Sequence, residues 1–165
     1  MAVSQDYPIY DGVAPSWADF SLFVDVPGAP LLDVKDVKAF SSSSSVEVGE
    51  QRGPGGRVKM RTTGQVKYEA SMTLYASGFV KFLDGLALVA PARGNQRVLS
   101  LVHFGIIQMW TPHGSTDIFE RRIKGARYMG DKVDASEGTD AQAVECPLSV
   151  LEVVTMRNGV ELVAL

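Results

Sequence analysis

One alternation of apolar and polar residues constrains this chain more than any other feature of its sequence. From Val58 to Leu74 the even positions are mostly apolar, aromatic or small, whereas the odd positions are polar or charged. A period of two residues predicts an extended strand with one apolar and one polar face. At about 3.3 Å per residue the run would span roughly 55 Å, although strands in globular proteins usually have about 5–6 residues. Such a ribbon is expected to extend beyond its own domain, which points to contacts between copies of the chain.

A Gly/Pro-rich turn precedes this alternation and predicts a projecting β-hairpin over about residues 46–63. The proline of Gly53–Gly56 fixes one backbone angle and the glycines accept positive φ, so this segment suits a tight turn. Residues 46–52 are then expected to pair with residues 57–63. A break at Thr62–Gly64 is expected to separate the hairpin from a core strand. The inward side chains of that core strand would be Val66, Tyr68, Met72 and Leu74.

Shorter alternating runs predict a mainly β chain with about seven to eight strands in all. An Asn-Gly pair at Asn158–Gly159 favours a hairpin turn because both residues accept positive φ. A break in the alternation near Asp36 predicts a bulge or bend. Outside the hairpin, extended structure is expected over residues 17–26, 31–48, 64–75, 98–110 (a central strand), 118–133, 144–155 and 160–165.

Only one stretch, residues 77–90, has the apolar spacing of a helix. Ser77 is the expected N-cap, and Pro91 is expected to end the helix. One amphipathic helix among many strands should close an open face or end of the sheet. We therefore expect an antiparallel β-sandwich or half-barrel in one domain, residues 1–165, with residues 1–16 as an irregular N-terminal arm.

Charge and cysteine content narrow the functional classes. The net charge of −3 and the pI of about 5.4 argue against a general nucleic-acid binder, which would be basic. Cys146 is the only cysteine, so no intrachain disulfide is possible, as is usual in a reducing compartment. The N-terminus lacks the basic start and apolar run of a signal peptide, and no apolar run approaches about 18 residues. These features predict a soluble chain without a membrane-spanning segment.

No residue pattern of a known catalytic, cofactor or metal site is present. The motifs HExxH, CxxC, GxSxG and GxGxxG are absent, and the glycine-rich turn lacks the Lys-Ser/Thr of a phosphate-binding loop. We interpret His103 as a satisfied sheet residue, His113 as a solvent-facing loop residue and Cys146 as a small buried hydrophobe. The chain is thus predicted not to be an enzyme and to need no cofactor.

Three polar clusters have ordinary structural interpretations. Asp131, Asp134, Glu137 and Asp140 surround a turn but lack the spacing of a calcium loop. The basic residues Arg121, Arg122 and Lys124 are expected to lie on a solvated strand edge or to form ion pairs. The run Ser41–Ser45 is expected to be a solvent-facing strand or loop rather than a linker or phosphorylation site.

Two segments carry a resemblance to a known family: RTTGQVKYEASMTLYASGFVKFL, from Arg61 to Leu83, and RIKGARYMGDKVDASEGTDAQAVECPLSVLEVV, from Arg122 to Val154. They resemble the strand–helix centre and the C-terminal portion of tail tube proteins of contractile-tailed phages, a family similar in fold to the Hcp proteins of type VI secretion. The resemblance implies hexameric rings that stack into a hollow tube, the conduit for DNA. It also implies tail sheath, baseplate hub and tail terminator proteins as partners, and assembly in the bacterial cytoplasm into a virion tail.

In such a tube the predicted hairpin would reach the adjacent ring. The resemblance also implies an acidic lumen, whereas the polar face of the long ribbon carries Lys59, Arg61 and Lys67 against Glu69. We therefore expect the basic residues near the hairpin to meet acidic groups of the next ring. The candidate contact residues are Glu47, Glu50, Arg52, Gly53, Pro54, Gly55, Gly56, Arg57, Lys59 and Arg61.

Other functions remain open from the sequence alone. An Hcp-like tube subunit of a secretion or injection machine and a tail-completion or baseplate-proximal ring protein would share the same fold. A monomeric β-sandwich binding module and an enzyme are alternatives of a different class. Only the tube and ring functions would account for a ribbon too long for a single domain.

Overall fold

The computed structural model describes residues 20–111, 116–134 and 141–163, and strands dominate these ranges. The predicted N-terminal arm lies outside them, and the extent of the domain, residues 1–165, stays a prediction. One α-helix is present in the described part, as expected. The elements are β1 (Phe20–Asp25), β2 (Leu32–Asp33), β3 (Val37–Glu47), β4 (Glu50–Arg52), β5 (Val58–Arg61), β6 (Gln65–Tyr75), α1 (Ala76–Ala87), β7 (Ala92–Arg93), β8 (Gln96–Arg97), a 3-10 turn (Leu99–Leu101), β9 (His103–Trp110), β10 (Phe119–Tyr128), β11 (Lys132–Asp134), β12 (Ala143–Ser149), β13 (Glu152–Arg157) and β14 (Val160–Val163).

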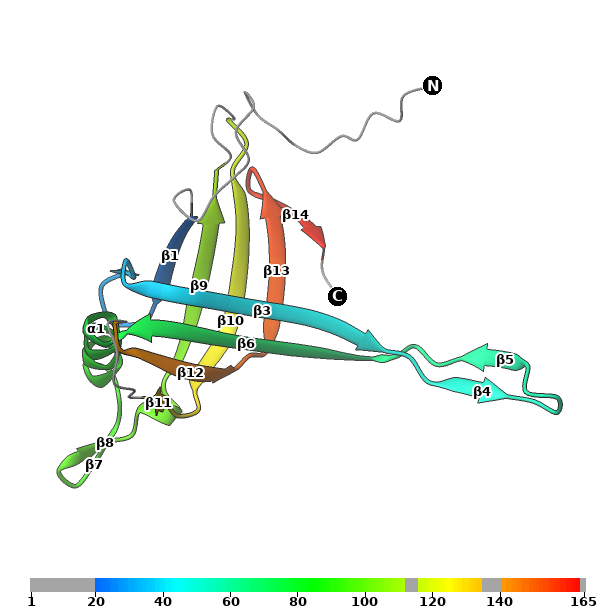
Figure 1. Cartoon of the computed structure of the whole chain (residues 1–165), viewed down its shortest axis with the longest axis horizontal. Coiled ribbons are helices and arrows are strands. Elements are labelled where there is room, and N and C mark those ends of the chain that lie inside the picture. Colours follow the sequence, from blue (N-terminus) through cyan, green and yellow to red (C-terminus); the bar gives the residue numbers. More distant parts are fainter. Residues whose placement is uncertain (1–19, 112–115, 135–140, 164–165) are drawn as a thin grey trace.

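Ten strands form one antiparallel sheet that folds over on itself. Its main path runs β2-β1-β9-β10-β12-β6-β3, while β11 pairs with β12, and β13 pairs with both β10 and β14. Figure 1 shows β3, β6 and β12 crossing in front of β9, β10 and β13. This arrangement confirms the expected half-barrel or sandwich and the central place of β9. The strand is shorter than the predicted 98–110, because Leu99–Leu101 form a 3-10 turn and β9 begins at His103. The main sheet has more strands than the seven or eight predicted, and β4–β5 and β7–β8 form two further small ribbons.

The sheet turns its corner where β10 changes partner. Residues Phe119–Lys124 pair with β13, whereas Arg127 and Tyr128 pair with β12. Gly125 between them has φ +64, and a Cβ there would lie 2.5 Å from the Leu151 side chain. The extended structure expected over residues 118–133 and 144–155 is interrupted in both cases: β10 ends at Tyr128 before β11 begins, and β12 ends at Ser149 before β13 begins. The chain bends between β12 and β13 because these strands belong to different layers.

The core lies between the two layers. Leu22, Val24 and Ile106 from one layer and Met72 and Leu74 from the other are at most 1% exposed. The inward orientation predicted along β6 is confirmed at Tyr68, Met72 and Leu74, which belong to or pack on the core. The predicted inward orientation is wrong for Val66, which is 38% exposed because this end of β6 lies outside the body of the protein.

Helix α1 closes one end of this core, as predicted. Phe82 and Leu86 are buried, and the Phe82 ring meets Phe104 edge-on with centroids 5.6 Å apart. Ser77 is not the N-cap: Tyr75 holds that position without a side-chain cap, and the Ser77 hydroxyl instead donates to Asp36 over 3.0 Å. The helix also ends at Ala87, before the residue predicted, because the chain continues as a tighter turn.

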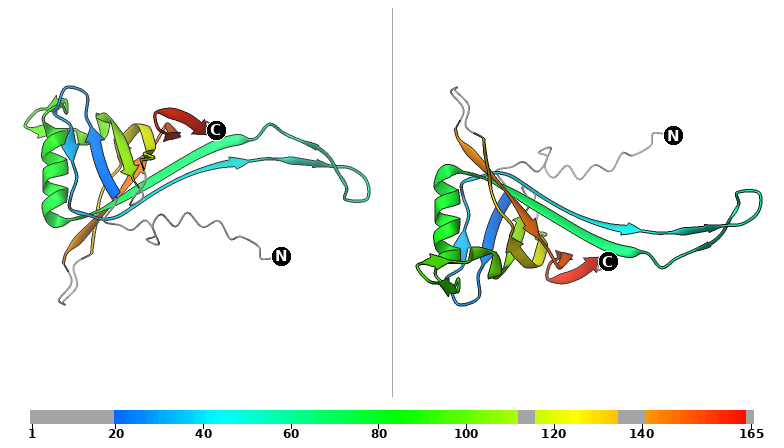
Figure 2. Two further views of the ribbon diagram at one scale, coloured as in Figure 1. Left: turned by 90° about the horizontal axis from the view of Figure 1, so that it is seen from above. Right: turned by 90° about the horizontal axis from the view of Figure 1, so that it is seen from below.

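Strands β3 and β6 form a ribbon that leaves the body of the protein. They pair from Val37↔Leu74 to Glu47↔Gln65, with a register shift between Val37 and Ala39, close to the bulge predicted near Asp36. Beyond this ribbon lies the β4–β5 hairpin, at the far end of the molecule from α1 (Figures 1 and 2). The predicted turn at Asn158–Gly159 is confirmed, with φ values of +50 and +79.

Candidate assembly surfaces

The outer end of the β3–β6 ribbon and the β4–β5 hairpin form a projection, residues 46–66, which we call the β-arm. No residue from 45 to 67 is buried, and among them only Gly53 is even half-buried. A two-stranded ribbon by itself is marginally stable in water. The β-arm therefore has a fold but no core within a single chain. The structure brings together all ten candidate contact residues here, although their role as contacts stays a prediction.

Local hydrogen bonds shape the base of the hairpin. Thr62 Oγ1 accepts from the Gly49 N–H over 2.9 Å and donates to the Gly49 carbonyl over 3.3 Å, while the Thr62 N–H donates to the same carbonyl. Next to it, Gly64 has φ +84, and a Cβ there would lie 2.6 Å from Val46. The predicted break at Thr62–Gly64 is confirmed. The hairpin's return strand, however, extends past residue 63, because Val46 pairs with Val66.

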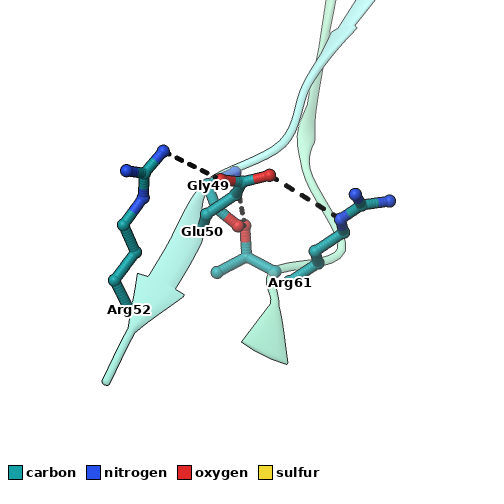
Figure 3. A network of polar contacts seen from close by, with 5 residues as sticks. Gly49, Glu50, Arg52 and Arg61 are labelled. Carbon is teal, nitrogen blue, oxygen red and sulfur yellow. Dashed lines mark hydrogen bonds and ion pairs between the residues drawn. The ribbon is translucent and has the colours of Figure 1, made fainter. Parts of the chain in front are cut away.

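Charged residues line the hairpin between this base and the turn. Glu50 lies 3.5 Å from Arg52 and 3.8 Å from Arg61, as Figure 3 shows. Exposed ion pairs of this kind contribute only about 0–1 kcal/mol each. Arg57 and Lys59 form no ion pair with any described residue, so their charges are available to another chain.

Apolar side chains on the β-arm were missed as candidate contacts. Five of them are 38–66% exposed, the largest fraction being that of Met60. The alternation of apolar residues at even positions is the sequence signal for them, but it indicates a strand and not which face of the strand is exposed. The five are Val46, Val48, Val58, Met60 and Val66.

The ribbon nearer the body has a hydroxyl-rich outer face. The predicted solvent-facing serine run is confirmed as part of β3, where Ser41, Ser43 and Ser45 are exposed. The Ser41 hydroxyl lies 2.8 Å from that of Ser71 on β6. Lys67 and Glu69 lie 2.6 Å apart, and this hydrogen bond raises the pKa of Lys67. Lys59 and Arg61 contribute to the basic character of the polar face in the sequence. Both lie on β5 of the hairpin and not on this part of the ribbon.

Several strand edges of the sheet have no partner within the described chain. The path of the sheet ends at β2 and β3, and β14 pairs only with β13. Free edges expose unpaired N–H and C=O groups and pair readily with another chain. The eleven-residue β3 offers the longest of these edges.

The histidine and cysteine residues that are described do not form a reactive site. Cys146 is buried as predicted, and burial raises the pKa of its thiol to about 12. His103 does lie on a strand but is exposed, because it starts β9 at the surface. Among the described residues no three His, Cys, Asp or Glu side chains come together as metal ligands. His113 lies outside the described ranges.

The two charged clusters are partly described. Arg122 lies 2.7 Å from Glu120 and Lys124 lies 3.2 Å from Glu152, which confirms ion pairing for two of the three basic residues. Arg121 is half-buried, and its Nε has no hydrogen-bond partner among the described residues. In the acidic cluster, Asp131 accepts from the Tyr128 hydroxyl over 2.5 Å. Glu137, Asp140 and the side chain of Asp134 are not among the described parts.

Comparison with solved structures identifies the fold. A chain of the PVC sheath/tube terminator, from an extracellular contractile injection system in its extended state, aligns with 93% of this chain and 99% of its own length (TM-score 0.62, 14% identity). A chain of the extended PVC sheath-tube complex aligns with 94% and 99% (TM-score 0.59, 13% identity). An Hcp protein aligns with 82% and 91% (TM-score 0.51, 11% identity).

These matches show that the chain has an Hcp-like tail tube fold, as the resemblance of its sequence implied. No protein-family model matches the sequence, and no curated protein matches it. The described helices are too short or too polar for any of them to cross a bilayer.

Proposed function

We propose that this chain is a structural tube subunit: six copies form a ring, and rings stack through the β-arm into the hollow tube of a contractile tail. The observation that carries the proposal is the β-arm itself, an ordered ribbon without a single buried residue between 45 and 67. Ordering such a ribbon costs conformational entropy, and an exposed apolar surface of this kind marks a contact with another molecule. The fold shared with chains of a sheath-tube complex supports a tube as that assembly.

We assign the wall of the lumen to the face of β3 and β6 that points away from the core of the chain. This face carries the exposed residues Ser41, Ser43 and Ser45. Hydroxyl groups dominate this face, and its charges near Lys67 are balanced by Glu69. A wall of this kind is well hydrated and offers no cluster of cations to hold a passing polyanion. Its test is a Ser43→Cys variant in assembled tubes: a small maleimide should react, and a maleimide on a polymer wider than the lumen should not.

Electron microscopy of the purified chain tests the tube directly. The proposal predicts rings or tubes, with a light-scattering mass that rises with concentration. A monodisperse protein at the chain mass of 17.8 kDa at high concentration would rule it out and would favour a monomeric binding module.

The molecule that passes through the tube distinguishes the two kinds of particle that are candidates here. As a phage tail tube, the polymer would carry DNA, meet sheath, baseplate hub and terminator proteins, and be assembled in the bacterial cytoplasm as part of the virion. The structural match to an extracellular contractile injection system favours a second candidate, an injection tube without a genome. Particles captured with an antibody to this chain would contain nuclease-protected DNA in the first case and lack it in the second. Neither candidate assigns a catalytic role to the chain.

A further inference from the structure

An apolar groove lies at the end of the molecule opposite the β-arm. It runs between the β1–β2 connection and the outward side of α1, where Gly85 leaves room beside Leu32. Both views in Figure 2 place α1 at one end of the long axis and the β4–β5 hairpin at the other. The groove is lined chiefly by Val26, Leu31, Leu32, Lys81, Asp84 and Leu88.

The outward side of α1 exposes large apolar side chains beside Lys81 and Asp84. Val80 and Leu88 are 57% and 69% exposed, and Leu31 across the groove is 56% exposed. Asp84 lies between Val80 and Leu88 at helical spacing, and its carboxylate forms no ion pair with any described residue. Lys81 also lines the groove, but its ammonium group lies 3.9 Å from the Asp36 carboxylate. The groove is therefore apolar with one cation that is paired to Asp36 and one carboxylate, that of Asp84, without an ion-pair partner among the described residues.

The β-arm is complementary to this surface. It presents five exposed apolar side chains together with Arg57 and Lys59, whose charges are unpaired among the described residues. Its residues 46–66 contain four basic and two acidic side chains, a net charge of +2. The remainder of the chain, with 12 of the 16 basic and 17 of the 19 acidic residues, carries −5. Opposite charges on two apolar surfaces favour and orient their association.

We propose that the groove between the β1–β2 connection and α1 receives the β-arm of a second copy of this chain. The inference rests on the proposed tube function and names the surface that accepts the arm. Because arm and groove lie at opposite ends of one chain, the contact is heterologous: each copy uses its arm on one neighbour and its groove on another. Such contacts do not close into a dimer but continue along an axis, as stacked rings require.

A disulfide between the two surfaces tests the pairing. Met60→Cys combined with Leu88→Cys in one chain should, on oxidation of assembled tubes, give a ladder of covalent multimers that reductant collapses. Cys146 is buried and should not contribute. Met60→Cys combined with Leu162→Cys is the matched control, since Leu162 is similarly exposed, at 55%, but lies on β14.

The outcomes separate the groove from the tube. Tubes that give no ladder with Leu88→Cys, or an equal ladder with Leu162→Cys, would overturn the groove and leave the tube standing. Failure of the unmodified chain to form rings or tubes would instead overturn the tube proposal.

If the cysteine pair impairs assembly, an exchange of charges between the groove and the β-arm tests the pairing instead. Asp84→Lys alone should weaken stacking severalfold, and Asp84→Lys with Lys59→Glu should restore it. Loss without restoration would contradict the pairing.

Discussion

The two ends of the β3–β6 ribbon have the same residue pattern and opposite environments. At the inner end, Met72 and Leu74 on the apolar face are fully buried. At the outer end, Val66 continues the same alternation but is 38% exposed, and Met60, beyond it on β5, is 66% exposed. Alternation specifies a strand with one apolar face, but it does not specify which molecule covers that face. The inner half is covered by the chain's own second layer, and the outer half, in our account, by another copy.

The largest predicted effect comes from making the same substitution, methionine to alanine, in the inner half and in the outer half. Met72→Ala should lower the free energy of unfolding by about 2–5 kcal/mol, because it opens a cavity in the core. Met60→Ala should change it by less than about 0.5 kcal/mol, as exposed substitutions usually do, yet it should impair tube assembly. Chemical denaturation and electron microscopy of both variants measure the two effects. Equal destabilisation by both variants would show that the β-arm belongs to the core after all.

Gly64 marks the boundary between the halves and gives the second prediction. Gly64→Ala should cost about 1–3 kcal/mol of local strain, because its positive φ is unfavourable for alanine. The added Cβ would also meet Val46, and so the arm should change direction and stacking should be lost while the body stays folded. Sedimentation of assembled material measures the loss.

Gly94→Ala is the matched control for this strain. Gly94, between β7 and β8 and outside the β-arm, also has a positive φ, +65, but open space surrounds its Cβ position. It should therefore retain much more assembly. If both variants assemble equally well, contact between residue 64 and Val46 does not set the direction of the arm.

A smaller effect concerns the charge of the β-arm. Lys59→Glu should raise the concentration needed for assembly severalfold, since an exposed contact is worth about 0–1 kcal/mol and recurs in every copy. Added salt should reduce the difference from the unmodified chain, because it screens exposed charges. Arg93→Glu, which makes the same charge change on the β7–β8 ribbon, should have little effect. An effect of Arg93→Glu equal to that of Lys59→Glu would mean that overall charge alone controls assembly.

The smallest predicted effect lies in the body of the protein and depends on pH. Hydrogen bonds from Asn158 and Arg157 lower the pKa of Asp117 from its ordinary 3.8. The native state thus favours the ionised carboxylate, so the stabilisation is present above pH 3.8 and is lost as the pH falls through the lowered pKa. Thermal unfolding from pH 6 to pH 3 should therefore show a slightly steeper loss for the unmodified chain than for Asp117→Asn. Identical pH profiles would contradict this role.

Turns and strand breaks that depend on a local residue pattern could be predicted from the sequence. Features that depend on packing between distant segments could not. The hairpin turn, the break at Thr62–Gly64 and the Asn158–Gly159 turn follow from the backbone freedom of glycine and asparagine. The corner at Gly125 was missed because it arises from contact with Leu151, which is distant in sequence. Ser77 does not cap the helix because the folded chain brings Asp36, which is distant in sequence, within hydrogen-bond distance of the Ser77 hydroxyl.

The candidate contact surface was predicted in position but not in full composition. The charged and glycine residues from Glu47 to Arg61 were identified because they stand out in the sequence. The exposed valines and Met60 were not, because an apolar residue in a strand is usually buried, and only the structure shows that here it is not. The groove at α1 could not be predicted at all, since it joins residues 26–32 to residues 84–88.

Removal of the hairpin tests the central claim most directly. Glu50 pairs with Arg61, so residues 51–60 can be replaced by an Asn-Gly turn that keeps the base of the hairpin closed. Electron microscopy of this variant should show single rings that do not stack, beside tubes of the unmodified chain under the same conditions. Full-length tubes from the shortened variant would contradict the account, because stacking would then not depend on the β-arm.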